Sequence, residues 1–273
     1  MTARICPLAS GSLGNALLVR TDRTAFLVDM GLTQRVLGEA LAAVGLGAEN
    51  IAAVLVTHTH RDHFSSAAVG WCLRHRIPVR STPANLADLR ARLPGFGRLV
   101  RAGLAVPIDG QAFAVGDVRA EAFDLPHDSP GGCLGFRLEF GPARARRAAA
   151  VATDLGHLPP ECLAHFLDCD AIVLESNHDP EMLRSSGRPW DLIERIAGPD
   201  GHLSNGDAAE TLAEIVGRSR PGRLRTVVLA HLSRDCNTPR LALAAQAHLA
   251  RRASDPIRVA AASQFRSGPM VEM

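Results

Sequence analysis

The chain has 273 residues, of which 47% are hydrophobic and 21% are charged, so it can bury a full core and lacks the composition of a disordered protein. Its formal net charge of +2 does not by itself predict a nucleic acid or a membrane as partner. No apolar run approaches the roughly 18–20 residues that a membrane-spanning helix needs, so we expect no association with a membrane.

Short apolar runs bounded by turn residues predict strands in the first part of the chain. These strands are expected at Arg4–Leu8, Ala16–Arg20, Ala25–Asp29, Ile51–Val56 and Pro78–Ser81. Apolar residues at helical spacing predict three helices in the same part, at Leu32–Val44, Ser65–His75 and Ala84–Leu93. Thr33 is the expected N-cap of the first helix, because its hydroxyl can accept from the first free backbone N–H groups.

A second block of strands and helices follows. Strands are expected at Gln111–Val115, Val118–Phe123, Cys133–Phe140, Ala148–Thr153, Ala171–Glu175, Thr226–Leu229 and Ile257–Ala260. Helices are expected at Trp190–Ile196, Asp207–Val216 and Pro239–Arg251. Because both halves contain strands and helices, two sheets packed face to face under outer helices are expected, although a doubly wound sheet fits the same pattern. No linker is evident, and we expect residues 1–273 to form a single domain.

The N-terminal residues and the cysteines bear on the compartment. The first fifteen residues contain no apolar stretch long enough for a signal peptide, so we expect a cytoplasmic protein. Thiols are usually reduced there, and the cysteines form no C-x-x-C pair. We therefore expect free, mostly buried thiols at Cys6, Cys72, Cys133, Cys162, Cys169 and Cys236. No segment indicates an obligate protein partner.

Every basic side chain is an arginine, since the chain contains no lysine. Arginine presents a planar fork of donors that suits phosphate, but a preference for arginine can equally reflect genome composition. Local clusters are candidate phosphate contacts, although each such cluster is more often a solvated face or loop. The clusters comprise Arg144, Arg146 and Arg147; Arg218, Arg220, Arg223 and Arg225; and Arg251 and Arg252.

Residues 57–63 read THTHRDH and follow the fourth predicted strand directly. Alternate residues of an extended segment share a face, so His58 and His60 can point the same way. Asp62 and His63 then turn back toward the same point. Imidazole nitrogens together with a carboxylate suit Zn²⁺, Mn²⁺ or Fe²⁺. A loop that is rich in histidine by chance is the competing interpretation, and it explains this spacing poorly.

Four donors on one loop cannot complete the coordination shells of two metal ions, so further donors are expected downstream. Taken singly, each has an ordinary explanation, because Asp154 could cap a turn and His231 could be a satisfied core histidine. Together, the repeated order of a strand followed by His or Asp is what a binuclear site requires. The candidates are His127, Asp128, Asp154, Glu175, His178, Asp179, His202 and His231.

The motif HTHRDH of residues 58–63, followed by His127, the Thr-Asp pair at Asp154 and Ala-His-Leu-Ser at His231, resembles the metallo-β-lactamase superfamily. That resemblance runs along essentially the whole chain and implies an α+β fold, a four-layer αββα sandwich with metal at the sheet edges. Shorter segments resemble the YycJ/WalJ-like branch, whose members are taken to be DNA exonucleases that act from 5′ to 3′. These segments are SGSLGN at 10–15, LESNHD at 174–179, GHLSN at 201–205 and LAHLSRDCNT at 229–238.

The resemblance implies two divalent metal ions, with Zn²⁺ or Mn²⁺ expected and Fe²⁺ as a further candidate. Transferred onto this chain, the ligands of the first metal are His58, His60 and His127, those of the second are Asp62, His63 and His231, and Asp154 bridges the two. Asp62 is also implied to orient the nucleophile or accept its proton.

The same resemblance implies supporting roles for other residues. Asp29 matches a buried aspartate that supports the ligand loop from behind, as metal-bound histidines usually require. Glu175 and His202 fall where tRNase Z enzymes keep a glutamate–histidine pair, in which the histidine assists the leaving group. Here the local sequence is GHLS and not the HST of those enzymes, so the transfer is less direct.

Three further features could contact substrate or only build the site. The SGSLGN segment could cradle a phosphate with its backbone N–H groups, but a tight turn that packs near the site is favoured, with Asn15 bonded to a ligand loop. Arg61 and Arg234 stand next to implied ligands, and each is as readily a salt-bridged loop residue as a phosphate clamp.

The leading hypothesis is therefore a metal-dependent phosphodiesterase, specifically a DNA exonuclease, with DNA favoured over RNA. The alternative is a small-molecule hydrolase of the same fold that acts on a thioester, a lactone or a cyclic phosphodiester. A binding module with a vestigial site is least favoured, because none of the seven implied ligand positions is lost.

Overall fold

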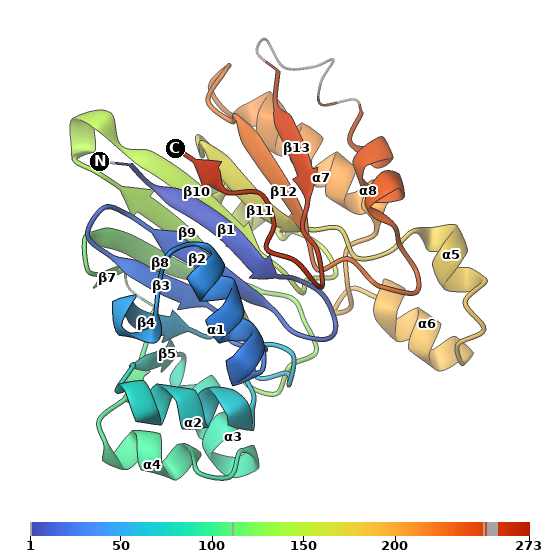
Figure 1. The fold of residues 1–273 in the computed structure, drawn as a ribbon. Helices are drawn as coiled ribbons and strands as arrows, with labels where there is room; N and C mark the ends of the chain where they lie inside the picture. Colours follow the sequence, from blue (N-terminus) through green and yellow to red (C-terminus); the bar gives the residue numbers. More distant parts are fainter. Residues whose placement is uncertain (1, 111, 248, 250–255) are drawn as a thin grey trace.

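Two β-sheets pack face to face, and helices cover the outer face of each sheet (Figure 1). The computed structural model describes residues 2–110, 112–247, 249 and 256–273. The architecture is the four-layer αββα sandwich of an α+β protein, so the expected fold class is confirmed.

The first sheet is built mainly from the N-terminal part of the chain, in the strand order β14-β1-β2-β3-β4-β5-β6. Its strands are β1 (Arg4–Ala9), β2 (Ala16–Arg20), β3 (Ala25–Val28), β4 (Ile51–Leu55), β5 (Val79–Ser81), β6 (Ala105–Pro107) and β14 (Val271–Glu272). β14 returns from the C-terminus to pair antiparallel with β1, placing Val271 opposite Ile5. Both ends of the chain are thereby joined to the same sheet.

The second sheet has the order β13-β12-β11-β10-β9-β8-β7. Its strands are β7 (Phe113–Val115), β8 (Val118–Leu125), β9 (Cys133–Phe140), β10 (Arg147–Ala152), β11 (Ala171–Glu175), β12 (Thr226–Ala230) and β13 (Arg258–Ala261). β10, β11 and β12 run parallel, with Ala152 opposite Leu174 and Glu175 opposite Ala230. The segments that follow these three strands therefore emerge at one edge of the sheet.

The helices divide between the two outer faces. The first sheet is covered by α1 (Gln34–Ala43), α2 (Ser66–His75), α3 (Pro83–Arg92) and α4 (Phe96–Arg101). The second sheet is covered by the 3₁₀ helix η3 (Pro160–His165) and by α7 (Asn205–Arg218) and α8 (Pro239–Ala245). The structure further gives bounds for α5 (Pro180–Arg184), α6 (Trp190–Ala197) and the 3₁₀ turns η1 (Ala48–Asn50) and η2 (Ala143–Ala145).

The core between the sheets is the feature that joins the two halves of the chain. It combines inward-facing residues of the first sheet, such as Phe26 and Leu55, with Phe136, Val151 and Val228 of the second. Burial of this apolar surface from both halves favours folding as one unit.

Most predicted elements are present within one or two residues of their expected ends, and Thr33 caps α1 by accepting from Val36 N–H. The sequence did not predict α4, β6, α5 or β14. These elements have between two and six residues, too few to establish a hydrophobic period. The helix expected over 239–251 ends at Ala245 in a tight turn, where Gln246 N–H donates to Leu243 O.

Some expectations fall on residues that the structure does not describe. These are the first residue of the strand expected at 111–115, part of the helix expected at 239–251, and the arginine pair at 251 and 252. All six cysteines are described, and they are free and buried as expected. Within the described residues, no helix combines the length and the apolar character needed to cross a membrane.

Replacement of Phe136 by alanine tests the inter-sheet core. Phe136 is fully buried there, so Phe136→Ala should lower the free energy of unfolding by roughly 3–5 kcal/mol in urea titrations. Phe265, which is 71% exposed, is the matched control, and Phe265→Ala should change that free energy by no more than about 0.5 kcal/mol. Both variants should unfold in a single transition. Two separate transitions would contradict the single-domain prediction.

Candidate metal centre

The predicted ligands follow strand ends in both sheets. In the first sheet, the loop 57–63 follows β4, and the parallel neighbour β3 brings Asp29 to the same edge, where Asp29 N–H donates to Leu55 O. In the second sheet, the other donors stand at or just after the ends of β8, β10, β11 and β12. These donors are His127, Asp154, Glu175 and His231.

The first group of donors is His58, His60 and His127, whose candidate ligand atoms lie within 4.8 Å of one another. His60 Nδ1 is 3.3 Å from His127 Nε2. His127 Nδ1 lies 3.0 Å from Gly201 O, which fixes the proton on Nδ1 and leaves Nε2 as the ligand atom. His58 Nε2 is buried without a hydrogen-bond partner among the described residues, as expected for a nitrogen that requires a metal.

The second group is Asp62, His63 and His231. Asp62 Oδ2 is 3.6 Å from His63 Nε2 and 3.4 Å from His231 Nε2. Asp154 lies between the two groups, with its carboxylate oxygens 3.1 Å from His63 Nε2 and 4.0 Å from His127 Nε2. The structure thus brings all seven predicted ligands together, with Asp154 between the two groups.

Asp29 supports the ligand loop from beneath. Its carboxylate accepts from Thr57 N–H at 2.8 Å and from the Thr57 hydroxyl at 2.9 Å, and it lies 2.8 Å from His63 Nδ1. His63 is thereby held with Nε2 directed at the site. The contact expected for Asp29 is present. Thr57, whose role was not evident from the sequence, links this carboxylate to His58, with its hydroxyl 3.0 Å from His58 Nδ1.

Glu175 supports the site from the second sheet. Its Oε1 lies 2.7 Å from His231 Nδ1 and 2.9 Å from His202 Nδ1, while Oε2 accepts from the N–H groups of Leu155 and Leu203. The expected Glu175–His202 pair is therefore formed. Its extension to His231 was not predicted, because sequence order does not reveal that one carboxylate reaches two imidazoles.

The chemistry of this donor set fits a divalent metal. Burial opposes charge on His231, but Asp154, Asp62 and Glu175 raise its pKa to about 10. Burial likewise opposes ionisation of Glu175, but His202 and His231 lower its pKa to about 2. Burial and neighbouring imidazoles lower the pKa of His58, which keeps its lone pair free. Buried carboxylates that hold protons on imidazoles in this way would equally stabilise a divalent cation.

Three residues of the site have a left-handed backbone. Asp29, Asp154 and His231 have φ values of 63°, 64° and 53°. A non-glycine residue in this region is strained, and such strain persists only where surrounding contacts impose it. Each of the three follows a strand of a sheet, so the turn redirects the side chain from the strand end toward the donors.

The SGSLGN segment forms the favoured tight turn, and several of its backbone N–H groups are bonded within the protein. Gly11 N–H donates to Asn15 Oδ1, Leu13 N–H to Gln264 Oε1 and Gly14 N–H to Gly11 O, so these donors are already used. Asn15 contacts the ligand loop as expected, with Nδ2 2.9 Å from His63 Nε2 and its backbone N–H donating to Asp62 O.

The remaining candidate residues do not belong to the two groups of metal donors. His178 is buried but belongs to none of the donor groups found among the described residues. Arg234 is an exposed partner of Asp235, with Nε 3.2 Å from Oδ1. Arg61 lines a cavity of about 770 Å³ beside Asp62, so it keeps access to a substrate. A further contact that the sequence did not reveal is Cys133, whose Sγ lies 3.7 Å from His58 Nδ1.

Comparison with known proteins agrees with this geometry. The family described as the beta-lactamase superfamily domain matches residues 24–231, well over half of the chain. The chain belongs to the metallo-β-lactamase superfamily.

Within the metallo-β-lactamase superfamily, the chain falls in the YycJ-like branch. Exodeoxyribonuclease YycJ of Bacillus anthracis is 32% identical over 235 residues, covering 86% of this chain and 84% of that protein. Exodeoxyribonuclease WalJ of Streptococcus pneumoniae is 29% identical over 244 residues, covering 86% and 83%. The structure of Zn²⁺-bound PqqB from Methylobacterium extorquens shares the fold, with a TM-score of 0.69 at 16% identity over 99% of this chain and 100% of that one.

As a metallo-β-lactamase-type protein with its histidine and aspartate cluster assembled, the chain is a metal-dependent hydrolase. The assignment of each of the seven side chains to a metal remains a prediction.

Replacement of Asp29 by asparagine tests the support of the ligand loop. In Asp29→Asn the side-chain amide cannot accept from both Thr57 and His63, so His63 should lose its fixed orientation. Metal affinity should fall roughly 10–100-fold in competition titrations against a zinc-binding dye. Asp22→Asn, at the exposed turn between β2 and β3, should leave the affinity unchanged. Equal affinities for the two variants would contradict the role given to Asp29.

Proposed function

We propose that the protein is a metal-dependent phosphodiesterase that degrades DNA from an end, in the 5′ to 3′ direction. The observation that carries the proposal is that two donor groups lie on either side of Asp154, with an adjacent Glu175–His202 pair. The exodeoxyribonuclease names of relatives that match along more than four fifths of both chains support DNA as the substrate. The direction rests on the family resemblance.

The donor set supports two divalent metal ions, Zn²⁺ or Mn²⁺, with Fe²⁺ as a further candidate. His58, His60 and His127 would hold one ion, Asp62, His63 and His231 the other, and Asp154 both. Such a pair of ions lowers the pKa of water toward about 7 and neutralises charge on a phosphate that is being cleaved.

The protein side chains perform the remaining steps. Asp62, which is partly exposed beside the 770 Å³ cavity, orients the attacking water and accepts its proton on a carboxylate oxygen. His202 Nδ1 is held by Glu175, so Nε2 is the nitrogen that delivers a proton to the departing oxygen. Glu175 fixes the ring of His202 and, through the same oxygen, the ring of His231.

The cavity beside Asp62 supplies a path for the nucleic acid backbone. Arg61 and Arg92 line it together with Ser65 and Ser66 at the start of α2. Both side chains are exposed, but Arg92 is bound to Thr59 O and Asp88, whereas Arg61 has no hydrogen bond or ion pair among the described residues, so Arg61 is the candidate phosphate contact. Because contacts with phosphates release counterions, DNA binding should weaken steeply with salt.

Two variants separate the roles of Asp62 and His202. Asp62→Ala should abolish turnover of end-labelled DNA, since it removes both a metal ligand and the proton acceptor. His202→Ala should retain metal and leave a residual rate lower by roughly 10²–10⁴. His157→Ala, which alters an exposed histidine, should keep the full rate. Full activity in a purified Asp62→Ala protein would refute the mechanism.

Removal of metal and a panel of substrates test the reaction class. Dialysis against EDTA should abolish activity, and Zn²⁺ or Mn²⁺ should restore it. Reconstituted protein should release mononucleotides from labelled single- or double-stranded DNA and hydrolyse bis-p-nitrophenyl phosphate. RNA and a chromogenic thioester are the comparison substrates. Turnover of the thioester alone would exclude the phosphodiesterase and favour a small-molecule hydrolase.

A further inference from the structure

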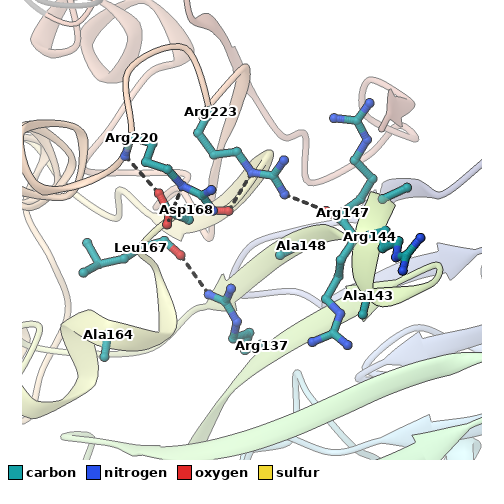
Figure 2. Close-up of a pocket in the computed structure, with 12 residues that line it drawn as sticks. Arg137, Ala143, Arg144, Arg147, Ala148, Ala164, Leu167, Asp168, Arg220 and Arg223 are labelled. Carbon is teal, nitrogen blue, oxygen red and sulfur yellow. Dashed lines mark hydrogen bonds and ion pairs between the residues drawn. The ribbon is translucent and has the colours of Figure 1, made fainter.

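A second cavity, of about 650 Å³, lies at the end of the second sheet opposite the metal centre. Figure 2 shows that its lining comes from four separate parts of the chain, namely β9, the turn between β9 and β10 with the start of β10, the segment before β11 and the segment before β12. Six of the lining residues are arginines. They are Arg137, Arg144, Arg146, Arg147, Arg220 and Arg223. Two arginine clusters that are separate in the sequence therefore meet in one cavity.

This cavity carries an excess of positive charge. Asp168 is the only acid among its lining residues in the described chain. Two more carboxylates, Glu139 and Asp170, pair with lining arginines from outside the cavity. Three acids against six arginines leave a formal excess of three positive charges, because Glu139 and Asp170 each pair with two of the lining arginines. The side chain of Arg144 is exposed and takes part in no ion pair found among the described residues.

Hydrogen bonds and ion pairs hold Arg137, Arg147 and Arg223 in place. The Asp170 carboxylate, 3% exposed, lies 2.9 Å from Arg147 Nη1 and 2.8 Å from Arg223 Nη2. Arg223 Nε also donates to Asp168 O, and Arg137 Nη1 donates to Leu167 O, as Figure 2 shows. Each guanidinium has five N–H donors and uses only some of them here, so the others remain for a ligand. A fixed guanidinium loses less entropy on binding an anion than a mobile one.

The position of the cavity separates it from the metal centre. β10, β11 and β12 begin beside it and end at the segments that carry Asp154, Glu175 and His231. β10 has six residues, so the two sites are on the order of 20 Å apart at about 3.3 Å per residue. A ligand in this cavity does not touch the catalytic groups.

We propose that this cavity binds a small anion with two or more phosphoryl groups, such as a nucleoside triphosphate. Guanidinium forks match phosphate oxygens, and a formal excess of three positive charges suits the negative charge of a di- or triphosphate. A volume of about 650 Å³ is typical of a small-molecule site, and a recessed cavity suits a compact anion better than the outer surface of a DNA duplex. Ala164 and Leu167 offer an apolar wall for the rest of the ligand.

Isothermal titration calorimetry with ATP and with pyrophosphate tests the proposal. Each probe is titrated into the protein as purified and again after treatment with EDTA, because phosphates can also bind a metal centre. Binding to the cavity should persist without metal. Loss of all binding after EDTA treatment would overturn the proposal, whether or not the protein proves to be a nuclease.

Two arginine variants locate the site. Arg144→Glu and Arg220→Ala alter exposed side chains, and each should weaken both probes at least about tenfold. Arg98→Glu, on the exposed face of α4 against the other sheet, should leave binding unchanged. All three variants should keep wild-type hydrolysis of bis-p-nitrophenyl phosphate, which verifies their folding. Unchanged ATP and pyrophosphate affinity in both cavity variants would overturn the assignment.

A labelled 20-base-pair DNA duplex tests whether the arginines contact DNA and not a small anion. Its affinity should be the same for the wild type and for both cavity variants. If Arg144→Glu weakened the duplex but not ATP, the arginines would be a contact for DNA, and the proposed small-anion site would be wrong.

Discussion

The carboxylate of Asp29 is the contact on which the arrangement of the metal centre depends. It is buried at the end of β3, where it accepts two hydrogen bonds from Thr57 and holds His63 by Nδ1. An ionised carboxylate is costly to bury unless its oxygens are paired, and the ligand loop supplies those partners. The loop and the carboxylate therefore stabilise each other. Glu175 has the equivalent position in the second sheet, where it holds His231 and His202.

The site lies between the sheets because each sheet supplies one supporting carboxylate. Asp29 directs donors from the first sheet, and Glu175 directs donors from the second, so neither half of the chain contains the whole site. The inter-sheet core fixes the distance between them. Asp29, Asp154 and His231 adopt a left-handed backbone, which turns their side chains inward from the strand ends. This backbone is strained, and the surrounding hydrogen bonds maintain it.

Much of this arrangement could be predicted from the sequence, for identifiable physical reasons. Buried strands such as β4 and β11 are apolar runs bounded by polar residues, and the spacing of His58, His60 and His63 is distinctive of one family. β14 could not be predicted, because its two residues become a strand only by pairing with β1 at the other end of the chain. The contact of Glu175 with His231 could not be predicted either, nor could the presence of Arg144 and Arg220 in one cavity, since both depend on tertiary structure.

We propose above all that the assembled donors hold two metal ions. Anomalous X-ray diffraction from crystals grown with Zn²⁺ or Mn²⁺ tests it directly. Two anomalous peaks about 3.5–4 Å apart are expected, one beside His58, His60 and His127 and the other beside Asp62, His63 and His231. Asp154 should lie within bonding distance of both. A single peak, or peaks away from these residues, would contradict the account.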